Sequence, residues 1–218
     1  IRVSFTGEQG FELHVAAEDA AALYDAIWAH PAAAREGLRA FGSAAVNSLR
    51  MEKGFCVKAD LDYAHWTEAG IEPFVALERP KAAHEFLGRH SAPPGAAPRR
   101  AALFEVATAP GFEWSVPSDC PVRDARGALV GFTTSCAHGA ETGKTLAKGF
   151  VLCDASAAGG APPVPLAAPG DAGLVVECYG ESWPVLVLER PPVGVRGMPA
   201  KGSAPGAVAP SRIAAAPR

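Results

Sequence analysis

Residues 5–14 read FTGEQGFELH, and this stretch decides how the front of the chain is interpreted. Gly7 and Gly10 can both adopt positive φ, so the segment between them is typical of a turn. The flanking runs, residues 2–5 and 11–15, are short and rich in aliphatic and aromatic side chains. The sequence therefore predicts a β-hairpin, or a tight strand–turn–strand unit, in this part of the chain.

Glu12 is the candidate ligand-binding residue of this hairpin. Side chains alternate between the two faces of a strand, which puts Phe11 and Leu13 on one face and Glu12 and His14 on the other. A carboxylate held beside a turn can accept hydrogen bonds from two adjacent N–H groups of a heteroaromatic ring such as a pterin. The alternative is an edge-strand carboxylate that faces only solvent.

Two helices are expected after the hairpin. Residues 18–29 carry apolar side chains at helical spacing, and Pro31 ends this run. Ser43 has the side chain of an N-cap for a second helix, which extends to about Lys53 and is stopped by Gly54.

Arg50 lies on the second helix, three residues after Asn47, so the two share a face. Its guanidinium could pair with the carboxylate of a ligand that binds beside the helix. The alternative is a solvated surface charge without a ligand.

The pattern becomes β-like from residue 99 onward. Before that point, residues 55–80 are expected to be irregular and residues 80–90 are expected to form a short helix. Residues 91–98 are rich in Pro and Gly, and we expect them to connect two domains. Six short runs bounded by turn signals predict a small barrel or sandwich. The expected strands are residues 101–107, 121–124, 128–134, 148–153, 173–179 and 182–188.

Composition excludes several classes of function. The chain has 218 residues and a formal net charge of -3, which argues against a nucleic-acid or anionic-membrane surface. The 5 cysteines lie far apart without a CxxC pair, so we expect reduced thiols rather than a disulfide framework or a structural zinc site. No nucleophile arrangement and no phosphate-binding glycine loop is found, so no catalytic residue and no metal ligand is predicted.

An ordered series of motifs resembles the glycine-cleavage T-protein (aminomethyltransferase) superfamily. Residues 5–14 resemble its Tyr-Thr-Gly-Glu-x-Gly-Phe/Trp-Glu signature. Residues 48–55, SLRMEKGF, are similar to its SLRLEKGY segment, in which Glu-Lys-Gly in place of Glu-Ala-Gly is typical of the sarcosine and dimethylglycine dehydrogenase branch. Further similar segments follow the same order: 37–42 (GLRAFG), 68–70 (EAG), 86–89 (FLGR), 129–135 (LVGFTTS) and 146–151 (LAKGFV).

The resemblance implies an α+β fold in three parts. Residues 1–90 correspond to the C-terminal part of a T-protein-type, folate-binding α/β domain. Residues 99–190 correspond to the small antiparallel β-barrel that follows it in the family. Residues 191–218, rich in Pro, Gly and Ala, are expected to be a disordered tail.

The resemblance also implies a function. The chain would be the tetrahydrofolate-binding region that passes a one-carbon unit, aminomethyl or methylene, from a small N-methylated amine donor to folate. FAD would belong to a separate domain upstream. Glu12 matches the glutamate that holds the pterin, Phe5 stands where the family has a stacking tyrosine, and Arg50 matches the helix arginine by motif.

The starting point at Ile1 leads us to expect a fragment, because the family's catalytic aspartate belongs to the half of the domain that would precede it. Such a fragment should be inactive alone and should bind tetrahydrofolate weakly or not at all. The family implies the mitochondrial matrix in a eukaryote and the cytoplasm in a bacterium.

Two alternatives stay open. Lys58 and Ala59 stand where the family has an aromatic residue and a glycine, which allows a non-catalytic relative such as a pyruvate dehydrogenase phosphatase regulatory subunit. Residues 54–56 are similar to part of the Lys-Gly-Cys-Tyr motif of iron–sulfur-assembly folate proteins. The Gly-Gln-Glu that follows in that group is absent, so this alternative ranks last.

Overall fold

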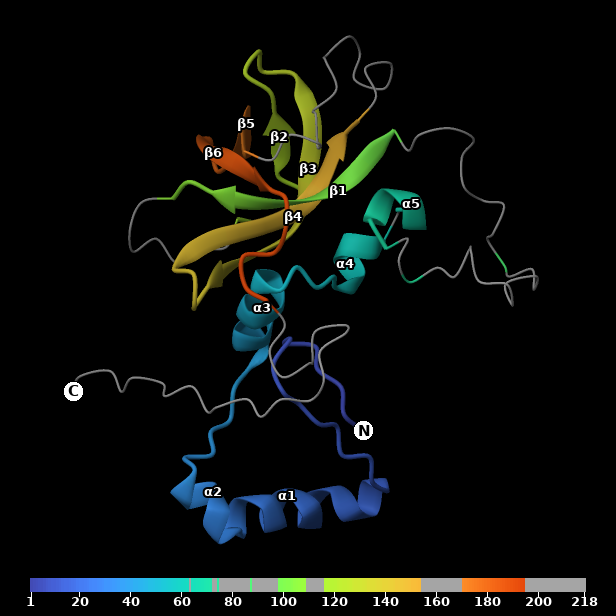
Figure 1. Ribbon diagram of the computed structural model, residues 1–218, viewed down its shortest axis with the longest axis vertical. Helices are drawn as coiled ribbons and strands as arrows, with labels where there is room; N and C mark the ends of the chain where they lie inside the picture. Colours follow the sequence, from blue (N-terminus) through green and yellow to red (C-terminus); the bar gives the residue numbers. More distant parts are fainter. Residues whose placement is uncertain are drawn as a thin grey trace, which may run out of the picture.

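The computed structural model describes residues 1–62, 64–71, 74, 87, 98–108, 116–153 and 170–194. Figure 1 shows an N-terminal part of loops and helices and a C-terminal β-barrel, joined by α3, α4 and α5. Apart from residue 87, the helix predicted at residues 80–90 lies outside the described residues, as do most of the predicted connector at 91–98 and the tail beyond residue 194.

Five α-helices and a short 3-10 helix are described before the barrel. They are η1 (Ala17–Asp19), α1 (Ala20–Ala29), α2 (Pro31–Arg35), α3 (Ser43–Glu52), α4 (Lys58–Leu61) and α5 (Trp66–Ala69). The two predicted helices, α1 and α3, are confirmed, but Gly42 rather than Ser43 is the N-cap of α3. The irregular structure expected for residues 55–80 was wrong at α4 and α5, because runs this short carry too little periodicity to be recognised.

Six antiparallel strands close the barrel in the order β1-β4-β3-β2-β5-β6. They are β1 (Arg99–Val106), β2 (Pro121–Arg123), β3 (Leu129–Gly139), β4 (Lys144–Leu152), β5 (Gly170–Cys178) and β6 (Glu181–Leu188). The α+β class with a small antiparallel barrel is thereby confirmed. Alternate side chains of these strands fill the interior, with Phe104, Val122, Val130 and Val151 at 0% exposure.

The hairpin predicted at the N-terminus does not form regular strands. Residues 1–15 make an open loop, here called the front loop, in which the N-terminus donates to Glu12 O at 2.8 Å and Glu12 N donates to Ile1 O at 2.9 Å. In the described part of the chain no strand pairs with either limb of this loop. An isolated pair of short strands is marginal in water, which explains why the β-like sequence gives a loop.

Two glycines let β3 and β4 approach closely. A Cβ at Gly131 would lie 2.1 Å from Phe150 O, and a Cβ at Gly149 would lie 2.2 Å from Phe132 O. Both glycines belong to segments that resemble the superfamily, 129–135 and 146–151. Only glycine fits where the two strands approach so closely, which explains why these two positions of the motifs are glycines.

α3 connects the N-terminal part to the barrel. Its side chains reach β3 carbonyls: Asn47 Nδ2 donates to Cys136 O at 2.8 Å, and Ser48 Oγ donates to His138 O at 2.7 Å. Met51, at 0% exposure, packs with Ala137 and Leu146 in a second small core. These contacts position the C-terminal end of α3 directly below the barrel (Figure 1).

α1 and α2 lie at the far end from the barrel (Figure 1). No residue of α1 is buried, and its apolar residues Tyr24, Ile27 and Trp28 are 59%, 38% and 40% exposed. The apolar stripe predicted from helical spacing therefore exists, but nothing in the described part of the chain covers it. None of the described helices is long and apolar enough to traverse a bilayer.

Candidate functional site

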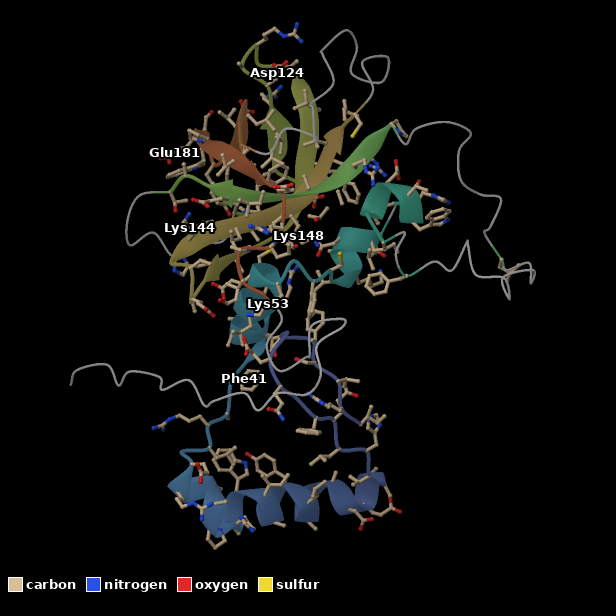
Figure 2. All side chains as sticks on the ribbon, in the orientation of Figure 1. Phe41, Lys53, Asp124, Lys144, Lys148 and Glu181 are labelled. Carbon is tan, nitrogen blue, oxygen red and sulfur yellow. The ribbon has the colours of Figure 1, made fainter. Side chains whose placement is uncertain are left out.

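The tip of the front loop docks on the C-terminal end of α3. Gly7 has φ 72°, and a Cβ there would lie 2.5 Å from Cγ of Lys53. Glu8 Oε1 lies 3.0 Å from Lys53 Nζ, and the Lys53 side chain is fully buried. This Nζ makes no hydrogen bond of good geometry to a described residue, so the contact is an ion pair by distance and charge. Lys53, labelled in Figure 2, is the lysine of the Glu-Lys-Gly variant, and its role is to hold the front loop.

Glu12 and Phe5 lie in the anchored loop and remain accessible. The Glu12 side chain is 62% exposed and its Oε2 lies 3.0 Å from His14 Nε2. Phe5 is 46% exposed. The shared face that alternation predicts for Glu12 and His14 therefore persists as a side-chain contact. The front loop thus carries an accessible carboxylate, which can accept hydrogen bonds from a flat heteroaromatic ligand, and an accessible aromatic ring, which can stack on one.

Arg50 is buried rather than turned to an open surface. Its exposure is 1%, and its Nε donates to Asn47 Oδ1 at 2.8 Å. Its Nη1 donates to Phe55 O at 3.1 Å and to Asp60 Oδ2 at 3.0 Å. Burial lowers the pKa of Arg50 and the charge of Asp60 opposes that shift. These contacts give Arg50 a scaffold role, and direct contact with a ligand stays a prediction.

Asp60 is the other half of this buried pair, and sequence reasoning missed it. Its Oδ1 accepts from Thr134 Oγ1 and Ser135 Oγ, each at 2.6 Å, while Oδ2 also accepts from Val57 N at 2.9 Å. The carboxylate thus joins α3, α4 and β3. The only signal in the sequence was an acidic residue shortly after Arg50, and nothing local showed that β3 would bury it.

Lys58 and Ala59, two of the departures from the superfamily pattern, are both exposed on α4. The Lys58 side chain is 87% exposed and its Nζ pairs with Asp62 Oδ2 at 2.5 Å. Neither side chain enters the Arg50–Asp60 contact. The substitutions therefore leave that buried pair intact.

A second ion pair joins α5 to the barrel. Arg99 Nε donates to Glu68 Oε1 at 3.0 Å, and the Arg99 guanidinium lies 5.0 Å from the centre of the Phe150 ring. Glu68 Oε2 also accepts from His65 N at 2.9 Å. Burial raises the pKa of Glu68, but the hydrogen bonds from Arg99 and His65 outweigh it, so the net pKa is lowered.

Lys148 of β4 connects the barrel to the segment between α3 and α4. Its Nζ donates to Gly54 O at 2.8 Å and to Cys56 Sγ at 3.0 Å. Next to it lies a cavity of about 420 Å³, lined by Gly54, Gly70, Arg100, Lys148 and Arg190 among others. Among the described residues no group of His, Cys, Asp and Glu is arranged to hold a metal ion.

The Gly7→Ala variant should release the front loop from α3. Its Cβ would force the Lys53 stem aside and would also require a rare φ for an L-residue. We expect faster amide hydrogen exchange at residues 8–12 than in the unaltered chain. Gly37→Ala is the matched control, because Gly37 has φ 69° but no neighbour within 4 Å. Equal effects of both variants on the loop would show that the Lys53 contact is unimportant.

The Glu68–Arg99 pair makes a contribution to stability that depends on pH. The pKa of this carboxylate is lower in the folded protein than in the unfolded chain. The ion pair therefore stabilises the fold fully at pH values above the pKa of the unfolded chain. That stabilisation is lost as the pH falls through the pKa of the folded protein. We expect the unfolding temperature to fall more steeply below about pH 4 in the unaltered chain than in Glu68→Gln. Parallel pH profiles for the two proteins would contradict this assignment.

The comparisons with known proteins agree with the motifs. Residues 1–79 match the GCVT N-terminal domain family. The chain is 33% identical to a protein from Homo sapiens named "Dimethylglycine dehydrogenase, mitochondrial". This alignment spans 197 residues and covers 88% of the chain. The chain is also 30% identical over 198 residues to an aminomethyltransferase from Saccharopolyspora erythraea. The chain is therefore homologous to the glycine-cleavage T-protein (aminomethyltransferase) superfamily, and within it to dimethylglycine dehydrogenases.

A solved structure supports the fold. The glycine cleavage system aminomethyltransferase T from Bartonella henselae superimposes with a TM-score of 0.62 over 89% of this chain, at 20% identity. The chain spans 49% of that structure's length, 47% of the Saccharopolyspora protein and 20% of the human dehydrogenase. The activities of those longer proteins are therefore carried over only as proposals.

Proposed function

We propose that this chain is the tetrahydrofolate-binding, one-carbon-transfer region of a flavoprotein similar to sarcosine and dimethylglycine dehydrogenases. The observation that carries the proposal is the front loop, whose tip is held by Lys53 while Glu12 stays 62% exposed. Homology to aminomethyltransferases supports a folate substrate. We place the protein in the mitochondrial matrix if it is eukaryotic, and in the cytoplasm if it is bacterial.

The residues present fit the chemistry of a pterin. Glu12 offers two carboxylate oxygens to the adjacent N–H groups of the ring, and Phe5 offers an aromatic face for stacking. Arg50 acts through the scaffold in this proposal, because it holds Asp60 and thereby the turn from α3 to α4. Folate bound there would accept a methylene or aminomethyl unit that originates from an N-methylated amine. FAD, which oxidises such an amine, is assigned to a separate domain.

The chain alone should bind tetrahydrofolate more weakly than the micromolar range, because it spans only about half of the T-protein relatives. It should also be inactive by itself. We expect Glu12→Gln to weaken the residual binding by about tenfold or more, since a hydrogen bond to a charged group is worth roughly 1.5–3 kcal/mol. Saturation-transfer NMR with tetrahydrofolate can measure dissociation constants in this weak range.

Glu18→Gln is the matched control for this titration, because it removes the same charge from an exposed residue of η1 outside the loop. It should leave the dissociation constant unchanged. Equal weakening by Glu12→Gln and Glu18→Gln would contradict the proposed site. Micromolar binding that Glu12→Ala abolishes would support the site and overturn the expectation that the chain alone binds weakly.

A non-catalytic relative, such as a pyruvate dehydrogenase phosphatase regulatory subunit, is the second candidate. Lys58 and Ala59 favour it, because they replace the aromatic residue and glycine of the superfamily pattern. A full-length protein that carries FAD, yet oxidises no N-methylated glycine, would favour this candidate over the first.

A further inference from the structure

Cys120 and Cys178 face each other across the barrel seam between β2 and β5. These strands pair antiparallel, with Val122 opposite Val176. Continuing the register by two residues puts Cys120 opposite Cys178. Val122 and Val176 are 0% and 1% exposed, so residues two positions away point to the same interior face. Cys120 belongs to the barrel core and Cys178 packs against that core.

The backbone on each side of this pair is fixed. Cys120 N donates to Thr133 Oγ1 at 3.1 Å, and Thr133 N donates to Cys120 O at 2.9 Å, so Cys120 continues β2 beside β3. Cys178 pairs with Glu181 across a tight turn, whose two central residues have φ 52° and 81°. Neither Cα can therefore move far from its partner.

The Cys120 thiol is also influenced by Cys178. Burial, reinforced by a hydrogen bond with Cys178, raises the pKa of Cys120 to about 11. Residues directly opposite in an antiparallel pair have Cα atoms about 4.5–5.5 Å apart. Disulfides span about 4.4–6.8 Å between Cα atoms, so the strand geometry already suits a covalent bridge.

Cys178 is reachable from solvent whereas Cys120 is not. Cys178 is partly exposed and lines a cleft of about 280 Å³ together with Glu177, Tyr179, Gly180, Glu181 and Ser182. Two carboxylates flank this cleft, and only that of Glu177 is paired with a described arginine, Arg123 at 2.7 Å. Because Arg123 offsets the charge of Glu177, Glu181 leaves a net negative charge at the cleft, which should slow anionic reagents relative to neutral or cationic ones.

We propose that Cys120 and Cys178 form a redox-active pair, which a small neutral or cationic disulfide oxidises to an intramolecular disulfide across the β2–β5 seam. Cys178 Sγ attacks one sulfur of the reagent, whose S–S bond breaks, and the first thiol leaves with the proton of Cys178. Cys120 Sγ then attacks Cys178 Sγ in the mixed disulfide. The second thiol leaves with the proton of Cys120, so two electrons pass from the protein to the reagent.

The bridge would strengthen a weakly paired part of the barrel. β2 and β5 are joined by 2 residue pairs, Val122–Val176 and Arg123–Val175. A covalent bridge closes a loop of several tens of residues, which restricts the unfolded chain. We expect the thermal unfolding midpoint of the oxidised chain to rise by about 5–10 °C.

The full chain treated with cystamine, a cationic disulfide, tests this proposal. We expect peptide mass spectrometry to find Cys120 linked to Cys178, with loss of one hydrogen from each residue. Oxidised glutathione, which is anionic, should react at least about tenfold more slowly because of the flanking carboxylates. A lasting cystamine adduct on Cys178 in the unaltered chain, no reaction, or a bridge from Cys178 to Cys136 would overturn the proposal.

Two variants separate the two steps. Cys120→Ala keeps a small apolar residue in the core and should stop the reaction at the mixed disulfide on Cys178. Cys153→Ser is the matched control, because Cys153 lies just after β4, outside the core cluster that holds the pair, and the variant should give the same bridge as the unaltered chain. A bridge from Cys178 to another cysteine in the Cys120→Ala chain, or the absence of any adduct on its Cys178, would also overturn the proposal.

Discussion

The Asp60→Ala variant is expected to lose about 3–5 kcal/mol of its free energy of unfolding. The Arg50 and Asp60 side chains are 1% and 3% exposed, and their contact is 3.0 Å. Removing the carboxylate leaves the guanidinium buried without its counter-charge. It also leaves the hydroxyls of Thr134 and Ser135 without the acceptor that they share. Urea unfolding, followed by tryptophan fluorescence, measures the loss.

The exposed ion pair between the first residue and the C-cap of the same short helix is the control for this variant. Lys58 and Asp62 form an ion pair between side chains that are 87% and 38% exposed. Because solvent screens such a pair, Asp62→Ala should change the free energy of unfolding by no more than about 0.5 kcal/mol. A loss of less than about 1 kcal/mol in Asp60→Ala would show that the buried pair does not hold α3, α4 and β3 together.

The Gly149→Ala variant is expected to cost at least about 2 kcal/mol, because a methyl group at this position overlaps a backbone atom. The added Cβ would lie 2.2 Å from Phe132 O and 3.0 Å from Thr133 Cα. Both neighbours belong to β3, which cannot retreat without breaking its pairing with β4. The barrel must therefore open at this seam or distort around it.

Gly194→Ala is the control for this substitution, since Gly194 has no neighbour within 4 Å and no positive φ. It should leave the thermal unfolding midpoint within about 2 °C of the unaltered chain. An equally small effect of Gly149→Ala would mean that β3 and β4 lie farther apart than the structure shows.

The barrel and α3 could be predicted from the sequence because several residues of each indicate the same structure. Strand runs separated by turn residues indicated six strands, and Ser43 and Gly54 indicated the two ends of α3 to within about two residues. The front loop misled the same reasoning, because its residues favour strands but the described chain gives them no sheet to join. β-propensity mainly reflects packing against neighbouring strands, so it fails where none is present.

The buried charges of the site could not be predicted from local patterns. Arg50 and Asp60 lie on helices and Lys53 caps the end of one, and charged side chains at such positions usually face solvent. Their burial comes from distant segments: the front loop covers Lys53, and β3 covers Asp60. Glu12 was a candidate from the alternation of side chains and was matched to the superfamily motif, and Phe5 was found through that motif alone. The contact between Gly7 and Lys53 that holds their loop needed the structure.

The central claim is that the front loop, held by Lys53, presents Glu12 and Phe5 to a pterin. It is tested most directly by titrating the ¹⁵N-labelled chain with tetrahydrofolate to millimolar concentration and recording amide chemical shifts. We predict progressive shifts in residues 5–14, with Glu12 among the largest, and unchanged resonances in α1. Shifts confined to the barrel or to α1, with the loop unchanged, would contradict the claim.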